Sequence, residues 1–172
     1  PKIPAAAVTI EDATWIRRPL LRGDAVTVTL KMGARTLKDV PSANVVAELK
    51  GREVPEEIVL IGGHLDSWDV GQGAHDDGGG CVASWEAARL LKTLELRPRR
   101  SVRVVLFTNE ENGLRGGRGY AQAHAAEAPR HVLAVESDAG VTDPTGFGLS
   151  ARPPDGLKRA QALLEPLLAP IG

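Results

Sequence analysis

The chain has 172 residues, and its 21 Lys and Arg residues nearly balance its 22 Asp and Glu residues, which gives a formal net charge of −1. This balance excludes nucleic-acid binding through a broad basic surface, because such binding needs an excess of positive charge. Hydrophobic residues make up 42% of the chain and charged residues only 25%, so a disordered acidic chain is excluded as well.

Cys81 is the only cysteine. An internal disulfide and a cysteine-rich zinc site are therefore excluded, and any metal must be held by histidine and carboxylates. No stretch reaches the roughly 18 apolar residues of a membrane helix, and no signal segment opens the chain. The chain starts at Pro1 and its only methionine is Met32, so we expect a segment of a longer protein, with any export signal outside it.

The first fifty residues favour short strands. Alternation of apolar and polar residues predicts one strand at 26–30 and another at 44–49, with a turn at 32–36 between them. The pattern then changes to that of an α/β protein. An apolar run at 57–63 predicts a buried strand, and a loop rich in Gly, Asp and His follows it at 64–80.

The rest of the chain alternates helices and strands. The predicted elements are a helix at 81–94, a strand at 101–108, a helix at 119–127 closed by Pro129, a strand at 131–136 and a helix at 154–168. This order implies parallel strands joined by right-handed crossovers. The sequence therefore predicts an α/β fold, a three-layer αβα sandwich with a mostly parallel sheet.

Polar residues that could carry chemistry collect just past the ends of three predicted strands. They are His64 and Asp66 after the first strand, Asp76 and Asp77 in its loop, Glu110 and Glu111 after the second strand, and Asp138 after the third. The carboxyl ends of parallel strands meet at one edge of a sheet, where open α/β sheets bind their ligands. We therefore expect these side chains to converge on one site.

Such a cluster, with no matching group of Lys or Arg, predicts a metal centre, because carboxylates so close together repel unless a multivalent cation neutralises them. An imidazole with carboxylates suits Zn²⁺ first, with Mn²⁺ or Co²⁺ as substitutes. Two ions about 3.5–4 Å apart would explain the number of acids. Taken singly, each residue could instead be a surface pair, a turn residue or a helix cap. Their placement at one edge favours the metal.

The two adjacent glutamates need different roles, because a tight metal ligand cannot also carry a proton. One of them is expected to bind metal while the other faces the attacking water. Among the remaining histidines, His124 is expected on a helix surface and His131 at the start of a strand. His75 is expected to support the site or to face the substrate rather than to bind metal.

Four motifs together resemble the co-catalytic zinc exopeptidases, and within them the plasma glutamate carboxypeptidases and their bacterial relatives. The motifs are GGHLDSWDVGQGA at 62–74, DDGGG at 76–80, TNEE at 108–111 and ESDAG at 136–140. Upstream, IPAA at 3–6 and LKMGA at 30–34 resemble the end of a protease-associated domain. The resemblance implies a β-rich remnant of that domain with its connection at 1–41, and the N-terminal part of a zinc peptidase domain at 42–172.

The resemblance also assigns roles to individual residues. It implies that His64 and Asp138 bind one zinc ion, that Asp76 bridges two ions and that Glu111 binds the second. Glu110 would be the general base that takes a proton from a metal-bridging water and passes it to the leaving amine. Asp66 would lie behind His64 and orient its ring. A cis peptide bond is expected between Asp76 and Asp77.

One departure from the family concerns the second metal ion, which has a further histidine ligand in the family. No histidine follows His131 in this chain. We therefore expect two Zn²⁺ ions in the complete parent enzyme but one well-formed site in this segment. The segment by itself is expected to be weakly active or inactive.

The leading interpretation is a zinc-dependent exopeptidase that hydrolyses dipeptides or short peptides. The alternatives are a catalytically inactive relative that serves as a binding module, an enzyme like the single-zinc glutaminyl cyclases, and a segment without an independent function. The expected partner is a peptide substrate, with neither nucleic acid nor membrane, and the parent protein could be a homodimer. The resemblance further implies a secreted, periplasmic or lysosomal protein.

Overall fold

The computed structural model describes residues 3–138, 140–142, 146, 148–150 and 154–169. The chain divides into two units, Pro1–Pro41 and Ser42–Gly172. In the first unit, helix α1 (Ile10–Leu21) begins where the side chain of Thr9 accepts the main-chain N–H of Asp12 at 3.1 Å. Glu11 and Asp12 in its first turn complement the helix dipole.

This helix corrects the expectation of a β-rich first unit. The strand predicted at 26–30 is absent, and residues 24–44 form neither helix nor strand. Alternation alone cannot make a strand, because the main-chain groups of a strand also need a neighbouring strand to pair with. Within the described part of 1–41, no such neighbour exists.

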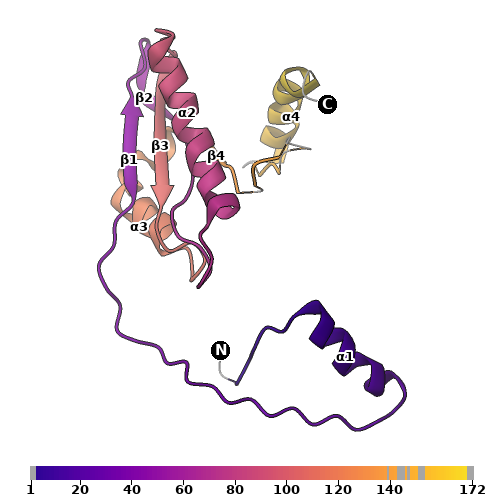
Figure 1. Cartoon of the computed structure of the whole chain (residues 1–172). Helices are drawn as coiled ribbons and strands as arrows, with labels where there is room; N and C mark the ends of the chain where they lie inside the picture. Colours follow the sequence, from indigo (N-terminus) through magenta and orange to yellow (C-terminus); the bar gives the residue numbers. More distant parts are fainter. Residues whose placement is uncertain (1–2, 139, 143–145, 147, 151–153, 170–172) are drawn as a thin grey trace. The chain divides into compact units, whose positions relative to one another are not determined.

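The second unit is built on a four-stranded sheet in the order β1-β3-β2-β4. Its strands are β1 (Val45–Leu49), β2 (Val54–His64), β3 (Arg100–Phe107) and β4 (His131–Glu136). Strand β2 runs parallel to both β3 and β4, whereas β1 pairs with β3 in the antiparallel direction. The predicted mostly parallel α/β sheet is therefore confirmed, with an antiparallel strand at one edge (Figure 1).

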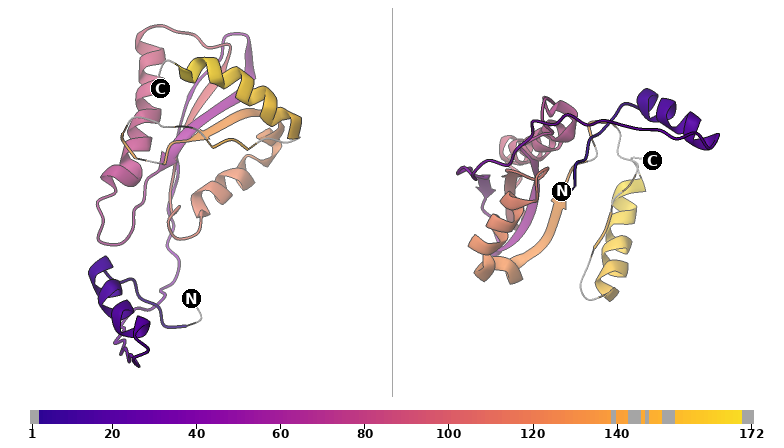
Figure 2. Two further views of the ribbon diagram at one scale, coloured as in Figure 1. Left: turned by 90° about the vertical axis from the view of Figure 1, so that its right-hand side faces the viewer. Right: turned by 90° about the horizontal axis from the view of Figure 1, so that it is seen from below.

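Helices cover both faces of this sheet. Val105 of β3 packs with Tyr120 of α3 (Arg115–Ala123), whereas Val104 and Leu106 pack with Cys81 of α2 (Gly79–Thr93). Because successive residues of a strand point to opposite faces, the two helices lie on opposite sides of β3. These are the layers of the predicted sandwich, and Figure 2 shows both helices beside the strands from two further directions.

Three further elements complete the second unit. They are the irregular turn Ala74–Gly78 before α2, the 3-10 helix Ala125–Arg130 after α3, and helix α4 (Pro154–Leu168). The helix predicted at 119–127 begins earlier than expected, and Pro129 lies within the 3-10 helix rather than after it. Among the described residues, no helix combines the length and apolar character that crossing a bilayer requires.

The register of the sheet brings the functional residues to one edge. His64, the last residue of β2, is paired with Phe107, the last residue of β3. On its other side, Gly62 of β2 is paired with Glu136, the last residue of β4. The segments that follow these three strands therefore leave the sheet side by side.

Candidate metal centre

His64 lies at the centre of this edge, and only 2% of its surface is exposed. Its Nδ1 lies 2.9 Å from the main-chain carbonyl oxygen of Asp66, and because a carbonyl can only accept, Nδ1 carries the proton. Burial acts to lower the pKa of His64, but the Asp66 carbonyl and the Asp138 carboxylate prevail and raise it. Because Nδ1 contacts the Asp66 carbonyl, Nε2 is the nitrogen that faces the carboxylates of the site.

Two carboxylates meet at Nε2 of His64. An oxygen of Asp76 lies 2.9 Å from this nitrogen, and an oxygen of Asp138 lies 3.1 Å from it. Asp76 comes from the turn before α2 and Asp138 from the segment after β4. The convergence expected from the order of the strands is thus present in the structure, with each of the two carboxylates in contact with the same imidazole nitrogen.

Glu111 brings a further carboxylate to this group. Its ligand atoms lie within 4.8 Å of those of His64 and Asp76. One of its oxygens, Oε1, is buried and has no hydrogen-bond partner among the described residues. Removal from water, with the negative charge of Asp76 as the next cause, raises the pKa of Glu111. A buried oxygen without a partner beside an imidazole nitrogen is what a bound cation would complete, so these residues fit zinc.

Asp77 is fully buried, and its carboxylate binds main-chain N–H groups next to the site. Its Oδ2 accepts the main-chain N–H of His64 at 2.9 Å, and its Oδ1 accepts that of Gly80 at 2.9 Å. Burial raises the pKa of Asp77, although these two hydrogen bonds act to lower it. The expected cis peptide bond joins Asp76 to Asp77. The sequence places Asp77 among the candidate residues but does not indicate this supporting role, because Asp76 and Asp77 are two adjacent residues of the same type.

Asp66 contacts the ring of His64 mainly through its main chain. Its main-chain carbonyl, not its carboxylate, holds Nδ1 of the imidazole, and the nearer carboxylate oxygen is 3.7 Å away. The carboxylate instead accepts the main-chain N–H groups of Glu110 at 2.9 Å and Glu111 at 3.2 Å. Asp66 therefore fixes both the ring of His64 and the loop that carries the two glutamates.

The other histidines lie outside this group. His131 is the first residue of β4, as expected, and its Nε2 is 2.9 Å from the hydroxyl of Tyr120. His124 follows the last residue of α3, is half-buried and stacks on Tyr120 with a ring separation of 4.3 Å. The described residues contain two groups of potential ligands, His64 with Asp76 and Glu111, and His64 with Asp77 and Asp138, and His75 belongs to neither.

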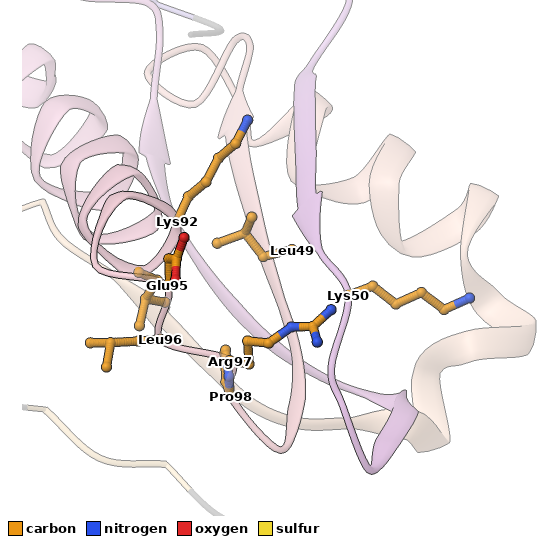
Figure 3. Close-up of a pocket in the computed structure, with 8 residues that line it drawn as sticks. Leu49, Lys50, Lys92, Glu95, Leu96, Arg97 and Pro98 are labelled. Atoms are coloured by element: carbon orange, nitrogen blue, oxygen red, sulfur yellow. The ribbon is translucent and has the colours of Figure 1, made fainter.

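A separate hollow lies at the opposite end of the sheet, beyond the end of β1 and the last turn of α2 (Figure 3). It is lined by Leu49, Lys50, Leu91, Lys92, Glu95, Leu96, Arg97 and Pro98. None of these residues belongs to the acidic group around His64. The candidate site is therefore the acidic edge of the sheet and not this hollow.

The chain is similar to known peptidases over nearly its whole length. The model of peptidase family M28 matches residues 44–172. Carboxypeptidase Q of Rattus norvegicus is 50% identical over 169 residues, which are 97% of this chain and 36% of that protein. Carboxypeptidase Q of Homo sapiens is 47% identical over 98% of this chain and 35% of its own length.

A solved structure gives the same result. A peptidase M28 precursor from Shewanella amazonensis SB2B superposes with a TM-score of 0.73 and 40% identity, over 91% of this chain and 36% of its own. A more distant relative, a probable leucine aminopeptidase 2 from Aspergillus fumigatus, is 29% identical over 78% of this chain and 26% of its own. The chain thus spans about a third of the length of these two carboxypeptidases Q.

Proposed function

The chain belongs to peptidase family M28, and from this premise we propose that its protein is a zinc-dependent exopeptidase that hydrolyses dipeptides or short peptides. The observation that carries the proposal is the meeting of Asp76 and Asp138 at Nε2 of His64, with the unpartnered oxygen of Glu111 beside them. Relatives named as carboxypeptidases and as an aminopeptidase support an exopeptidase without deciding which end of the peptide is cleaved.

The ligands proposed are those that lie around His64. His64 and Asp138 would hold one zinc ion, Asp76 would reach two ions and Glu111 would hold the second. When bound, zinc would polarise the peptide carbonyl and lower the pKa of a water molecule. Asp77 is not proposed as a ligand, because both of its oxygens already accept main-chain N–H groups.

Glu110 is proposed as the general base. Its carboxylate would take a proton from the attacking water and return it to the amine that leaves when the peptide bond breaks. The adjacent Glu111 cannot do this if it binds metal, so the two neighbours divide the tasks. Support for this role comes from the hydrogen bond of the main-chain N–H of Glu110 to the carboxylate of Asp66, because the main-chain carbonyl of Asp66 contacts His64.

The remaining expectations stay predictions. They are the assignment of 1–41 to the end of a protease-associated domain, a secreted, periplasmic or lysosomal location, and a homodimer of the parent protein. The proposed partner is a peptide substrate, which follows from the family and not from a contact in the structure.

The test is Glu110→Gln, which keeps the shape of the side chain and removes its basicity. In the full-length parent enzyme we expect zinc content equal to wild type and kcat on a dipeptide lower by about 10²–10⁴-fold. The matched control is Glu56→Gln, an exposed glutamate of β2 away from the site, with unchanged kcat. Turnover that survives Glu110→Gln would contradict the assigned base.

A further inference from the structure

The segment that follows β4 crosses directly over the residues that begin α2. A methyl group added at Gly80 would lie 1.7 Å from the main-chain oxygen of Ser137, and one at Gly79 would lie 2.1 Å from Cγ1 of Val141. Both distances are far shorter than any real contact of a Cβ atom, so only glycine allows the two segments to approach so closely. We call this close crossing the glycine seam.

The side chain of His75 adds a further contact between these two segments, close to Asp76 and Asp138. A methyl group added at Gly140 would lie 2.1 Å from Nε2 and 2.4 Å from Cε1 of His75, so the imidazole ring lies against the main chain of Gly140. Gly140 also has a φ of 93°, which residues with a side chain rarely adopt. His75 directly precedes Asp76, and Gly140 lies two residues after Asp138. The ring is therefore a side-chain contact between the two segments that carry these carboxylates.

The carboxylates themselves have little else to hold them. The side chains of Asp76 and Asp138 are 54% and 51% exposed. In the part of the chain that the structure describes, the only ion pair or hydrogen bond of either carboxylate is with Nε2 of His64. Two like charges at one nitrogen repel each other. The placement of the two acids before metal arrives therefore depends on how their main-chain segments are packed together.

We propose that His75 is a positioning residue for metal binding, and that its ring, packed on Gly140, holds the Asp138 segment against the turn of Asp76 so that both carboxylates face His64. This inference rests on the proposed function, because a metal ion is what the two carboxylates would bind. The role is one of packing and not of ligation, since His75 is absent from both groups of potential ligands among the described residues.

The test compares His75→Ala with His75→Phe by titration of Zn²⁺ in competition with a chromophoric chelator. Loss of the ring should weaken zinc affinity by about 10–100-fold, the usual effect of removing a residue that orients metal ligands. A phenyl ring keeps the flat contact but cannot bind metal, so His75→Phe should retain nearly the wild-type affinity. The visible absorption bands of the Co²⁺-substituted protein should change in His75→Ala and not in His75→Phe.

Three control variants isolate the cause. His124→Ala removes a histidine away from the site and should leave zinc affinity unchanged. Gly140→Ala should weaken zinc binding, because the added methyl group displaces the ring of His75. Gly23→Ala is its matched control, since Gly23 has a φ of 83° but nothing within 4 Å of an added Cβ. Gly23→Ala therefore introduces backbone strain without a contact and should leave zinc affinity at the wild-type value.

Two outcomes would overturn the inference. Equal loss of affinity in His75→Ala and His75→Phe would show that the imidazole binds metal, and full affinity in His75→Ala would show that the ring is not needed. Both leave the proposed exopeptidase intact, provided that Glu110→Gln loses turnover. Conversely, wild type could bind zinc, His75→Ala could weaken this binding, and Glu110→Gln could stay active. In that case the inference holds and the assigned mechanism fails. A wild-type protein that does not bind zinc would overturn both.

Discussion

The carboxylate of Asp66 accepts the main-chain N–H of Glu110 at 2.9 Å. Its second oxygen accepts the N–H of Glu111 at 3.2 Å, and its main-chain carbonyl holds Nδ1 of His64 at 2.9 Å. One residue therefore connects the central imidazole to the loop of the two glutamates, with its main chain on one side and its side chain on the other. The two connections can be separated by mutation, because only one of them involves the side chain.

Asp66→Asn should disturb the position of the loop that carries Glu110 and Glu111 more than the orientation of the His64 ring. The amide keeps one acceptor oxygen but turns a donor towards the second N–H, while the carbonyl that holds His64 is unchanged. In the full-length parent enzyme we expect kcat to fall by about 10–100-fold, with a smaller loss of zinc affinity. Kinetics on a dipeptide and zinc titration measure the two effects, with the exposed Asp69→Asn as control. A variant that loses zinc but keeps its turnover per bound ion would contradict this division of roles.

Asp77→Ala should lower the free energy of unfolding of the zinc-free protein. It leaves the N–H groups of His64 and Gly80 without an acceptor, at a cost of about 1–3 kcal/mol for each buried group. The burial that raises the pKa of Asp77 offsets part of this loss, since the charged carboxylate is itself costly to bury.

Asp77→Asn keeps one acceptor and should therefore lose less stability than Asp77→Ala. Urea unfolding with the exposed Asp69→Ala as control measures the order of the variants. An Ala variant as stable as wild type would show that the two N–H groups find other partners.

The sequence predicted the elements with strong local signals. Strand 131–136 and helix 154–168 occur with the expected bounds, because an unbroken apolar run and a proline at a helix start are visible in any context. Helix α1 has a local signal too, a threonine cap followed by Glu11 and Asp12, but its sequence lacks a clear apolar stripe. The strand expected at 26–30 fails for a non-local reason, the lack of a partner strand.

The site shows the same division between local and non-local information. Convergence of His64, Asp76 and Asp138 follows from the order of parallel strands, so it could be predicted. The tasks of Asp66 and Asp77 could not, because they depend on which main-chain N–H groups point at each carboxylate. Hydrogen bonds of this kind are set by the path of a loop, which residue types alone do not specify.

Glu127 should make the stability of the protein depend on pH. The hydrogen bond from Arg103, 2.7 Å away, lowers the pKa of Glu127, and the hydrogen bond from His124 at 3.0 Å acts in the same direction. A carboxylate whose pKa is lower in the folded state adds stability above its unfolded-state pKa. This stability is lost as the pH falls through the lower, folded-state pKa.

Glu127→Gln should therefore lower Tm at pH 7, and its difference from wild type should shrink as the pH is lowered below the ordinary glutamate value of 4.5. Thermal unfolding of both proteins between pH 7 and pH 3 measures this, with the exposed Glu56→Gln as control, whose Tm should follow wild type throughout. A difference that grows in acid would reverse the assigned sign.

This chain should bind one zinc ion tightly. Both groups of potential ligands found among the described residues contain His64, and its Nδ1 is already occupied by the Asp66 carbonyl. Only Nε2 is left, and one nitrogen lone pair can bind one ion. A second ion would have carboxylate oxygens alone, which bind zinc less tightly than a set that includes nitrogen.

Calorimetric titration should therefore give one strong site per chain and a second that is much weaker. Free zinc at 100 times the Kd should raise the free energy of unfolding by about 2.7 kcal/mol. In His64→Ala both the strong site and this stabilisation should disappear, whereas Glu111→Gln should affect mainly the weaker site. Two strong sites in wild type would mean that a further nitrogen or a differently placed carboxylate reaches the second ion, and the assignment of ligands around His64 would have to be revised.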